Sequence, residues 1–341
     1  MDLFGLTKTE LEEHLMRKGL QRFRATQLLD WVYKKGKTEV DEFTNWPKKM
    51  RERYSDPSVL GLSILPLKEK LIQNSLDGTK KALLELKDGE LVETVYIPES
   101  DRATVCFSSQ VGCKMGCNFC ATGKSGFSRD LEAGEIVGQL YYWQQTKGLR
   151  VTNAVAMGQG EPLDNWDNFL KALYIINDAD CLNLGARHLT VSTCGIVPGI
   201  KKMAKEPLQV NLSVSLHAPT DELRSQIMPI NRRYPLKELM EAIEEYIRET
   251  NRRVTLEYTV IPRFNDGKTN AALLIALLKD RLVHVNVIPV NPQVGEDEGE
   301  SLYHAKEFVN LIKPQLNVTL RRSRGADIDA ACGQLRRKVL K

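Results

Sequence analysis

Three closely spaced cysteines have the clearest potential for chemistry in this chain. Cys113, Cys117 and Cys120 follow one another with C-x3-C-x2-C spacing, and Phe119 stands just before the last of them. Three thiolates on one short loop can ligate three corners of a cubane iron–sulfur cluster. A structural zinc ion would need a fourth ligand, usually from a second cysteine pair with matching spacing, and the sequence has none. We therefore expect a cluster with one iron open to a small molecule.

A second candidate loop follows the next predicted strand and reads MGQGEP over residues 157–162. Glycines such as Gly160 let the backbone approach a ligand closely, and the Glu161 carboxylate can pair with an ammonium group. Alone, this pattern is more often a simple turn. One strand–helix unit after the cysteine loop, it indicates a ligand-binding site.

Alternating strand and helix patterns from about Thr104 to Leu320 must position these loops. Strands are expected at 104–108, 151–157, 187–193, 210–218, 253–262, 284–291 and 317–322, and helices at 132–143, 166–177, 236–249 and 270–280. This alternation predicts an α/β fold with a parallel sheet, as a full or partial barrel, whose site lies at the carboxyl ends of the strands. The acidic segment 296–300 is expected to be a solvated loop.

The first hundred residues predict two smaller units before the barrel of residues 101–341. Residues 1–60 indicate a helical module, with Thr7 and Glu10 at capping-box spacing. Its charges are mixed, so contact with RNA stays open. Residues 61–100 indicate a β-hairpin connection, because Asp88-Gly89 separates two alternating apolar runs.

Glu93 is a carboxylate in an otherwise apolar row on the second hairpin strand. Leu91, Val95 and Ile97 share its face by the two-residue period of a strand. The ordinary interpretation, which we favour on this pattern, is an acid on a solvated face. The alternative is a desolvated carboxylate whose raised pKa would suit proton transfer.

Composition and the N-terminal residues predict a cytoplasmic globular protein. The 341 residues carry a formal charge of +4, which neither identifies nor excludes a nucleic-acid partner. The N-terminus has acids where a secretory signal needs a basic start, and no apolar run approaches the ~20 residues of a membrane span. In a reducing compartment we expect no permanent disulfide framework, and Cys181 and Cys194 are interpreted as core residues.

Several strings resemble one enzyme family, the radical S-adenosylmethionine (SAM) RNA adenine methyltransferases that modify 23S ribosomal RNA. They are CFSSQVGC (106–113), SLHAP (215–219), MPIN (228–231) and DIDAACGQL (327–335). The string VETVYIP (92–98) is similar to the members that methylate adenine C2 rather than C8. Gln159 and Val290 depart from the family pattern, which often has Met and an aromatic residue there.

The resemblance implies a role for each candidate residue. Cys113, Cys117 and Cys120 would hold a [4Fe-4S] cluster. Contacts to SAM would come from Gly160, Glu161, Ser192, Ser215, Leu216, His217 and Asn291. Without the resemblance, His217 would be interpreted as a structural histidine, and the single polar residues as strand caps.

The resemblance also implies a reaction that uses two SAM molecules per turnover. One methylates Cys332, and the other, on the cluster, gives the radical that activates this S-methyl group. Adenine C2 is then tethered to Cys332 and loses its proton to Glu93 or Cys106, which sequence alone does not rank. Cys106 finally forms a transient disulfide with Cys332.

The implied partners are 23S rRNA, with tRNA as a second substrate, and a flavodoxin-type electron donor for a monomeric enzyme. From Lys313 onward eight Lys and Arg face two Asp, a basic end that suits phosphate contacts or is simply solvated. Three alternatives stay open: a C8 methyltransferase, another radical SAM class such as a glycyl-radical activase, and a zinc-stabilised RNA-binding module.

Overall fold

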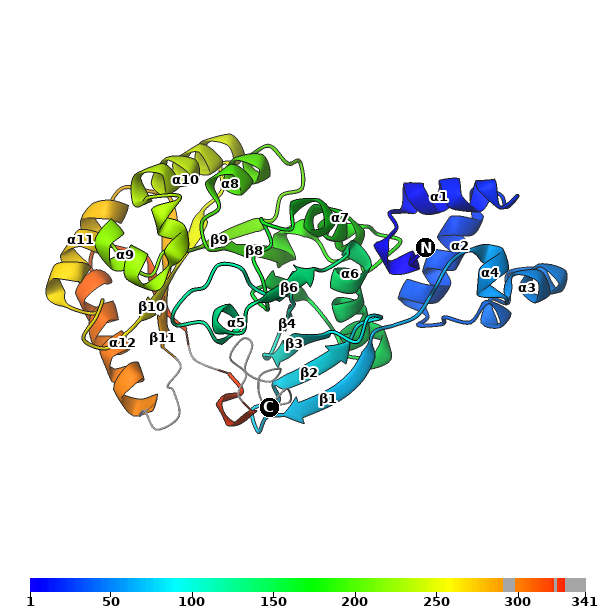
Figure 1. The fold of residues 1–341 in the computed structure, drawn as a ribbon, viewed down its shortest axis with the longest axis horizontal. Coiled ribbons are helices and arrows are strands. Elements are labelled where there is room, and N and C mark those ends of the chain that lie inside the picture. The colour runs from blue at the N-terminus through cyan, green and yellow to red at the C-terminus, as the bar shows by residue number, and fades with distance from the viewer. Residues whose placement is uncertain (291–297, 322–323, 329–341) are drawn as a thin grey trace.

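A ten-stranded sheet forms the centre of the computed structural model, which describes residues 1–290, 298–321 and 324–328 (Figure 1). The strand order is β1-β2-β3-β4-β7-β8-β9-β10-β11-β12, so β1 and β12 are its two edges. The six pairings from β4 to β12 are parallel, whereas β1 to β4 pair antiparallel. The strands are β1 (Lys68–Asn74), β2 (Lys80–Glu85), β3 (Leu91–Pro98), β4 (Ala103–Cys106), β7 (Asn153–Ala156), β8 (Leu189–Thr193), β9 (Asn211–Ser215), β10 (Val254–Val260), β11 (Val283–Pro289) and β12 (Val318–Leu320).

Helices cover the outer face of the curved sheet and leave the other face concave (Figure 1). They are α6 (Ala133–Tyr141), α7 (Trp166–Asn177), α8 (Val197–Ala204), α10 (Leu236–Thr250), α11 (Lys268–Leu278) and α12 (Glu298–Ile312). The short helix α9 (Asp221–Ile227) lies instead at the strand ends, beside residues 117–120. This arrangement confirms the predicted α/β fold with a mostly parallel sheet. All seven predicted strands of the barrel and its four predicted helices are present. In the described parts of the chain, no helix is long and apolar enough to cross a lipid bilayer.

The burial pattern of the strands separates the two faces of the sheet. Along β8, Leu189, Val191 and Thr193 are buried, whereas Thr190 and Ser192 are half-buried. In β11 the same alternation buries the valines and leaves His284, Asn286 and Ile288 half-buried. Because successive side chains of a strand point to opposite faces, the apolar set packs under the helices and the polar set lines the concave face.

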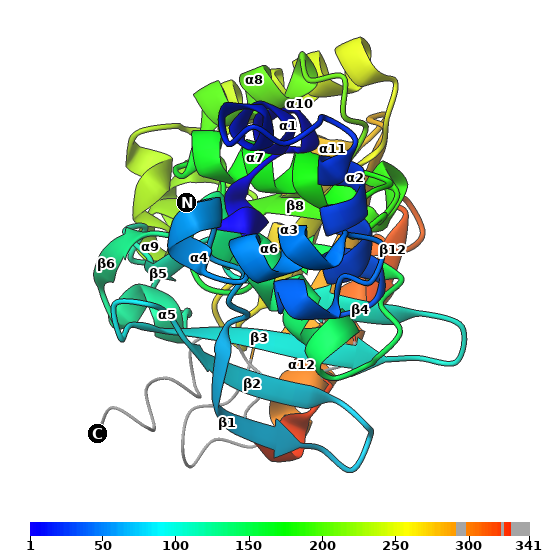
Figure 2. The same ribbon diagram turned by 90° about the vertical axis from the view of Figure 1, so that its right-hand side faces the viewer.

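The N-terminal helices pack together at one end of the molecule, beside α6 (Figures 1 and 2). They are α1 (Lys8–Arg17), α2 (Arg24–Leu29), α3 (Lys48–Tyr54) and α4 (Pro57–Leu60). The predicted capping box is confirmed: the Thr7 side chain accepts from the Glu10 backbone, and the Glu10 carboxylate accepts from the Thr7 N–H. Phe4 packs on Tyr141 of α6 with ring centroids 4.6 Å apart, which joins these helices to the barrel.

Two elements differ from the sequence prediction. The expected hairpin of β2 and β3, with Gly89 at a φ of +83°, gains the outer strand β1. That strand was missed because its residues are mostly exposed and charged, so no apolar alternation marks it. The loop predicted for 296–300 is also wrong in part, because α12 begins at Glu298 and Glu300 pairs with Arg263 across 2.5 Å. Acidic residues favour the first turn of a helix, where they face its positive dipole end.

Candidate active site

The cysteine loop lies between two short paired strands, β5 (Gln110–Gly112) and β6 (Phe127–Asp130), and continues into α5 (Ala121–Lys124). The strands close the base of the loop, where the Cys113 N–H donates to the Gly126 carbonyl over 2.9 Å. Gly112 has a φ of +78°, and a Cβ there would collide with the same carbonyl oxygen. Only glycine therefore allows this closed base.

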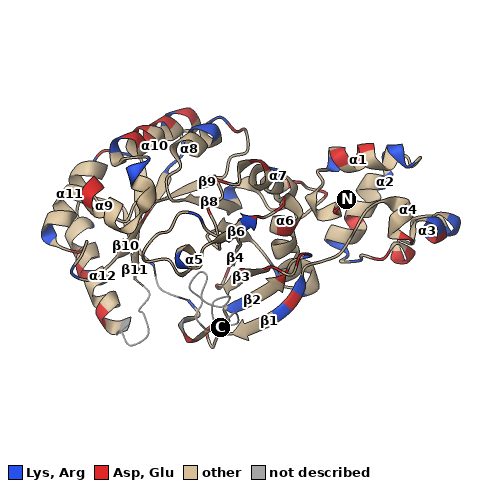
Figure 3. Cartoon of the chain, viewed as in Figure 1, with Lys and Arg blue, Asp and Glu red and all other residues tan. Residues whose placement is uncertain are grey.

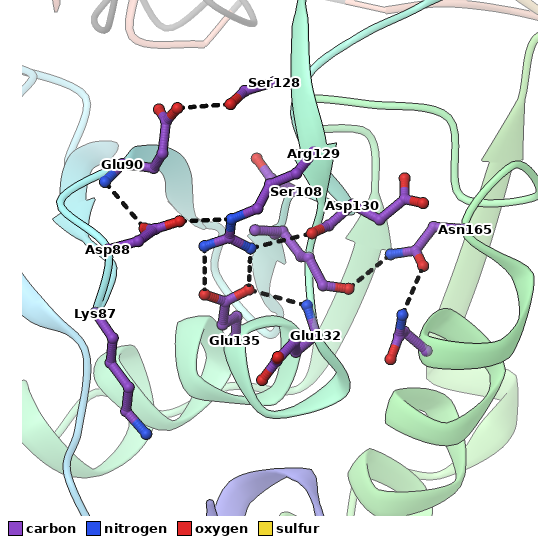
Figure 4. A network of polar contacts seen from close by, with 12 residues as sticks. Lys87, Asp88, Glu90, Ser108, Ser128, Arg129, Asp130, Glu132, Glu135 and Asn165 are labelled. Atoms are coloured by element: carbon purple, nitrogen blue, oxygen red, sulfur yellow. Dashed lines mark hydrogen bonds and ion pairs between the residues drawn. The ribbon is translucent and has the colours of Figure 1, made fainter.

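A charged network fixes the outer end of this hairpin (Figure 4). Arg129 of β6 binds the Glu135 carboxylate of α6 through two N–H groups, at 2.7 and 2.8 Å, and its Nε donates to Asp88 over 2.6 Å. A guanidinium that bonds a carboxylate through two nitrogens is held in direction as well as distance. The cysteine loop is thus tied to α6 and to the β2–β3 turn.

The three predicted cluster ligands lie near one another, and two of them, Cys117 and Cys120, are in an apolar setting. Cys117 is buried and packs with Cys194, Ile227 and Met228, and Cys120 lies against the same group. Burial raises the pKa of the Cys113 and Cys117 thiols to about 12. Bound iron would supply the positive charge that keeps such sulfurs as thiolates.

This donor set fits a cubane cluster. In the described ranges, no three His, Cys, Asp or Glu side chains are gathered as one metal ion requires. A cubane attaches each cysteine to a different iron, so its ligands need no common point. Three sulfurs from one short loop, two of them packed against apolar side chains, meet that requirement.

Glu161 connects the second candidate loop to the end of β8. Its carboxylate is 3% exposed and accepts from the Leu163 N–H over 3.0 Å and the Cys194 N–H over 2.7 Å. Burial raises its pKa, and these hydrogen bonds oppose that effect. Gly160 precedes it with a φ of +100°, and a Cβ there would lie 2.5 Å from the Gln110 Cβ. The predicted ammonium partner would be a further donor to this carboxylate.

Gln159, which departs from the family pattern, lies in the same loop. Its side chain is 2% exposed, and its amide oxygen has no hydrogen-bond partner among the described residues. A buried, unpaired amide oxygen is costly unless a further donor completes it. The oxygen therefore suits a ligand beside this loop.

His217 lies between the end of β9 and the cysteine loop. Its backbone has a φ of +56°, and its Nδ1 accepts from the Thr259 N–H over 2.9 Å, so Nε2 carries the hydrogen. Burial lowers its pKa to about 3, so the ring is neutral. The ring packs edge-to-face on Phe119, with centroids 4.7 Å apart. The structure therefore brings His217 to the cluster ligands.

Strand register places the other predicted residues on the concave face. Cys106 pairs with Val95 of β3 on one side and Val155 of β7 on the other, and Ser192 lies opposite Ser213. Ser215, half-buried at the end of β9, pairs with Glu257, while the N–H groups of Leu216 and His217 donate to the Glu257 carbonyl. The side chains of Cys106, Ser192 and Ser215 thus share the surface that the cysteine loop borders, whereas the Leu216 side chain is buried in the main core.

Glu93 lies on this concave face, and its predicted solvated position is wrong. The side chain is 4% exposed, and its carboxylate lies 3.6 Å from the ammonium of Lys81, which is fully buried. Glu93 is two residues before Val95, the partner of Cys106, so Glu93 and Cys106 are diagonal neighbours on one face. The hairpin pattern missed this burial because the hairpin is part of a ten-stranded sheet, and this face lines the concave side of that sheet.

Two predicted site residues, Asn291 and Cys332, lie outside the described residues. The chain leading toward Cys332 is anchored at the turn between β1 and β2. Asp327 accepts from the Ser75 hydroxyl over 2.5 Å and from the Leu76 N–H over 3.0 Å, and Gly325 donates to Asp77 over 3.0 Å. The tail thus reaches from β12, one edge of the sheet, to β1 at the other.

Sequence reasoning missed two contributors to the site, Arg224 and Cys194. Arg224 of α9 is fully buried beside the ends of β8 and β9, although its sequence context, DELRSQ, is typical of a surface helix. The MPIN string at 228–231 was the sequence signal for this arrangement, because its Asn231 binds the Arg224 side chain. Cys181 and Cys194 are both buried, as predicted. Cys181 lies in the main core, and Cys194 lies in a second apolar cluster beside Cys117, a contact that the sequence did not indicate.

Comparison with known proteins agrees with this geometry. Residues 107–275 match the family model of the radical SAM superfamily, and residues 1–59 match that of the ribosomal RNA large subunit methyltransferase N-terminal domain. Two curated relatives carry the description "Probable dual-specificity RNA methyltransferase RlmN". The one from Streptococcus thermophilus CNRZ 1066 is 45% identical over 99% of this chain and 89% of its own length. The one from Geobacillus thermodenitrificans NG80-2 is 47% identical over 99% and 93%.

A solved structure is similar over nearly the whole chain. It is the radical SAM methyltransferase from Sphaerobacter thermophilus, which is 44% identical and has a TM-score of 0.91 over 98% of both chains.

Proposed function

The chain belongs to the RlmN family of radical SAM RNA methyltransferases, and on that premise we propose that it methylates C2 of an adenine in 23S rRNA and of an adenine in tRNA. The observation that carries the proposal is the shared concave face. Glu93 and Cys106 are neighbours on it, and the cysteine loop and the ends of β8 and β9 border it. Proton removal and thiol chemistry can therefore act on one base.

The proposed cofactors are a [4Fe-4S] cluster on Cys113, Cys117 and Cys120 and SAM beside Glu161. When bound, they supply a one-electron cleavage of SAM that activates a methyl group otherwise unreactive toward adenine C2. The chain orients this chemistry: Glu161 offers a carboxylate to the SAM ammonium, and neutral His217 offers a donor at Nε2. Further contacts are assigned to Gly160, Ser192, Ser215, Leu216 and Asn291.

Cys332 is the proposed carrier of the one-carbon unit. Its thiolate attacks the methyl carbon of one SAM and displaces S-adenosylhomocysteine, which leaves an S-methylcysteine. After C2 is tethered to this carbon, a base must remove the C2 proton. We assign that role to Glu93, because its carboxylate shares the concave face with Cys106 and lies 3.6 Å from the ammonium of Lys81. The Cys106 thiolate then attacks the Cys332 sulfur and the disulfide forms as the bond between that sulfur and the linking carbon breaks. The freed carbon takes up a proton and becomes the methyl group of the released base.

RNA is the proposed polymer partner, and basic side chains on the helical module and on β1 support this proposal. Lys and Arg lie on α3 and along β1 (Figure 3), namely Lys48, Lys49, Arg51, Arg53, Lys68 and Lys70. Phosphate contacts by such residues would weaken as salt rises. The adenine would have to leave its stack to reach the concave face. A flavodoxin-type electron donor, a monomeric state and a cytoplasmic location complete the proposal.

One reconstitution experiment tests the reaction. The protein is loaded anaerobically with iron and sulfide and incubated with SAM, reductant and either 23S rRNA fragments or tRNA. Mass spectrometry of digested RNA should find 2-methyladenosine with the wild type and with Cys181→Ala, and none with Cys332→Ala. Detection of 8-methyladenosine instead would establish the C8 alternative. SAM cleavage that leaves both RNAs unmodified would refute the methyltransferase proposal.

Two variants separate the late steps. Cys106→Ala should accumulate RNA covalently linked to Cys332, because no thiol releases it. Glu93→Gln should accumulate the same adduct with the C2 hydrogen retained, which deuterium at C2 would reveal. Full turnover by Glu93→Gln would remove Glu93 from the mechanism and leave proton removal to Cys106.

A further inference from the structure

Arg224 is a buried cation whose hydrogen bonds all go to neutral acceptors. Its Nε donates to the Leu216 carbonyl over 3.1 Å, and its Nη2 donates to the carbonyls of Cys194 over 2.7 Å and Ser215 over 3.0 Å. Its Nη1 donates to the Asn231 amide oxygen over 2.8 Å. The side chain is fully buried, and within the described ranges no carboxylate forms an ion pair with it.

These contacts join two strand ends of the site. Cys194 follows β8, and Ser215 and Leu216 end β9, so one guanidinium fixes both chain segments relative to each other. Asn231 holds the guanidinium from the other side and is fixed in turn by Asp221, whose carboxylate accepts from its amide over 2.9 Å. The MPIN string of the sequence supplies this amide.

The helix that carries Arg224 also binds the cysteine loop. The Asn118 N–H donates to the Ile227 carbonyl over 3.0 Å, and the Asn118 side chain donates to the Gln226 carbonyl over 2.5 Å. Cys117 and Cys194 pack against Ile227 and Met228 at the same place. Arg224 therefore lies between the ends of β8 and β9 and the proposed cluster ligands.

Neutral hydrogen bonds alone do not account for a cation at this position. Burying a guanidinium that pairs directly with no carboxylate costs several kcal/mol, and Asp221 acts on Arg224 only from behind Asn231. A neutral amide could serve some of the same carbonyls. Burial lowers the pKa of Arg224 to about 10, so the group still carries its charge near neutral pH. Three cysteine thiolates on a cluster would provide further negative charge beside the guanidinium, since they outweigh the charge of the oxidised cubane core.

We propose that Arg224 is a positioning residue with two effects: it fixes the ends of β8 and β9, and its charge stabilises the reduced state of the cluster. The inference rests on the cluster assigned in the proposed function. A nearby positive charge favours the state with one more electron, because that state is more negative. Removing the charge should therefore make reduction of the cluster harder. Keeping the charge but removing the hydrogen bonds of the guanidinium should disturb the ends of β8 and β9.

The test compares two substitutions with a matched surface control in the full-length, anaerobically reconstituted protein. Arg224→Gln removes the charge. Arg224→Lys keeps the charge but lacks the several N–H groups with which the guanidinium binds different carbonyls. Arg232→Gln, the control, removes an exposed charge nearby. The measurements are iron and sulfide content, the midpoint potential from a redox titration followed by electron paramagnetic resonance, and the Kd for SAM.

Arg224→Gln should lower the equilibrium constant for one-electron reduction at least tenfold, which is about 59 mV. It should also weaken SAM binding. Arg224→Lys should keep the wild-type potential but bind SAM at least tenfold more weakly, and Arg232→Gln should change neither. If Arg224→Gln does not fold, the Arg224→Lys variant still tests the proposal. A shifted midpoint potential or an unchanged SAM affinity in Arg224→Lys would overturn it.

A wild-type potential in folded Arg224→Gln would also overturn it. A wild-type protein that binds no iron–sulfur cluster would instead refute the proposed function, so the two failures are distinguishable.

Discussion

The concave face and the tail anchor both position proposed reacting groups, but they do so with different kinds of contact. On the concave face the polar contacts are buried, as in the Lys81–Glu93 pair and the Glu161 carboxylate. At the tail anchor, Asp327 and the turn residues Leu76 and Asp77 are exposed. Water can replace an exposed hydrogen bond at little cost, whereas a broken buried one leaves a desolvated group. The cofactor side is thus fixed, and the segment toward Cys332 is held by exchangeable contacts.

The largest expected effect is on the buried pair of the concave face. Lys81→Met removes the cation that faces Glu93 and should destabilise the protein by about 3–5 kcal/mol, because the carboxylate stays buried. Urea unfolding measures this change. The double variant Lys81→Met/Glu93→Leu should recover most of the loss. If it is no more stable than the single variant, the pair is not a coupled unit.

A smaller effect is expected at Glu161. Glu161→Gln replaces one acceptor oxygen with an amide donor that opposes the N–H of Leu163 or Cys194, so the free energy of unfolding should fall by about 1–3 kcal/mol. SAM affinity should fall with it. Glu238→Gln, at an exposed position of α10, is the matched control and should leave both quantities unchanged. Equal effects of the two substitutions would contradict the buried role of Glu161.

The buried histidine predicts a pH dependence. The pKa of His217 is lowered from 6.5 to about 3 by burial, so between these values the unfolded chain binds a proton that the folded chain does not. Its contribution to stability is present above pH 6.5 and falls by about 1.4 kcal/mol per unit as the pH decreases toward 3. The His217→Asn variant lacks this pH-dependent contribution to stability. The stability difference between wild type and variant should therefore shift with this slope in urea titrations from pH 6.5 to 4.5. A pH-independent difference would argue against a neutral, buried ring.

The smallest expected effect is at the tail anchor. Asp327→Asn should leave the free energy of unfolding unchanged, because its contacts are exposed. The rate of tryptic cleavage after Arg324 should rise a fewfold, roughly as expected for weakened local contacts. Hydrogen bonds from Ser75 and Leu76 lower the pKa of Asp327, so the anchor should weaken only as the pH falls below the usual carboxyl range. A destabilisation as large as that of Glu161→Gln would remove the contrast between the two regions.

Local patterns were sufficient to predict the barrel strands, the capping box at Thr7 and the hairpin turn at Gly89. Each depends on residues close in sequence, where side-chain period and turn preference act directly. The outer strand β1 was missed because its exposed, charged residues show no such period. The acidity of residues 296–300 predicts a solvated loop, but acidic residues also favour the first turn of a helix, and α12 begins at Glu298.

The sequence by itself determined the α/β alternation, the C-x3-C-x2-C loop and the family resemblance, because these follow from residue types at short spacing. Only the tertiary structure decided the surroundings of particular groups. Glu93 is buried because its strand joins the ten-stranded sheet. Arg224 is buried and links the ends of β8 and β9, although its helix has the sequence of a surface helix. Burial is a property of contacts between distant segments, and no short pattern encodes it.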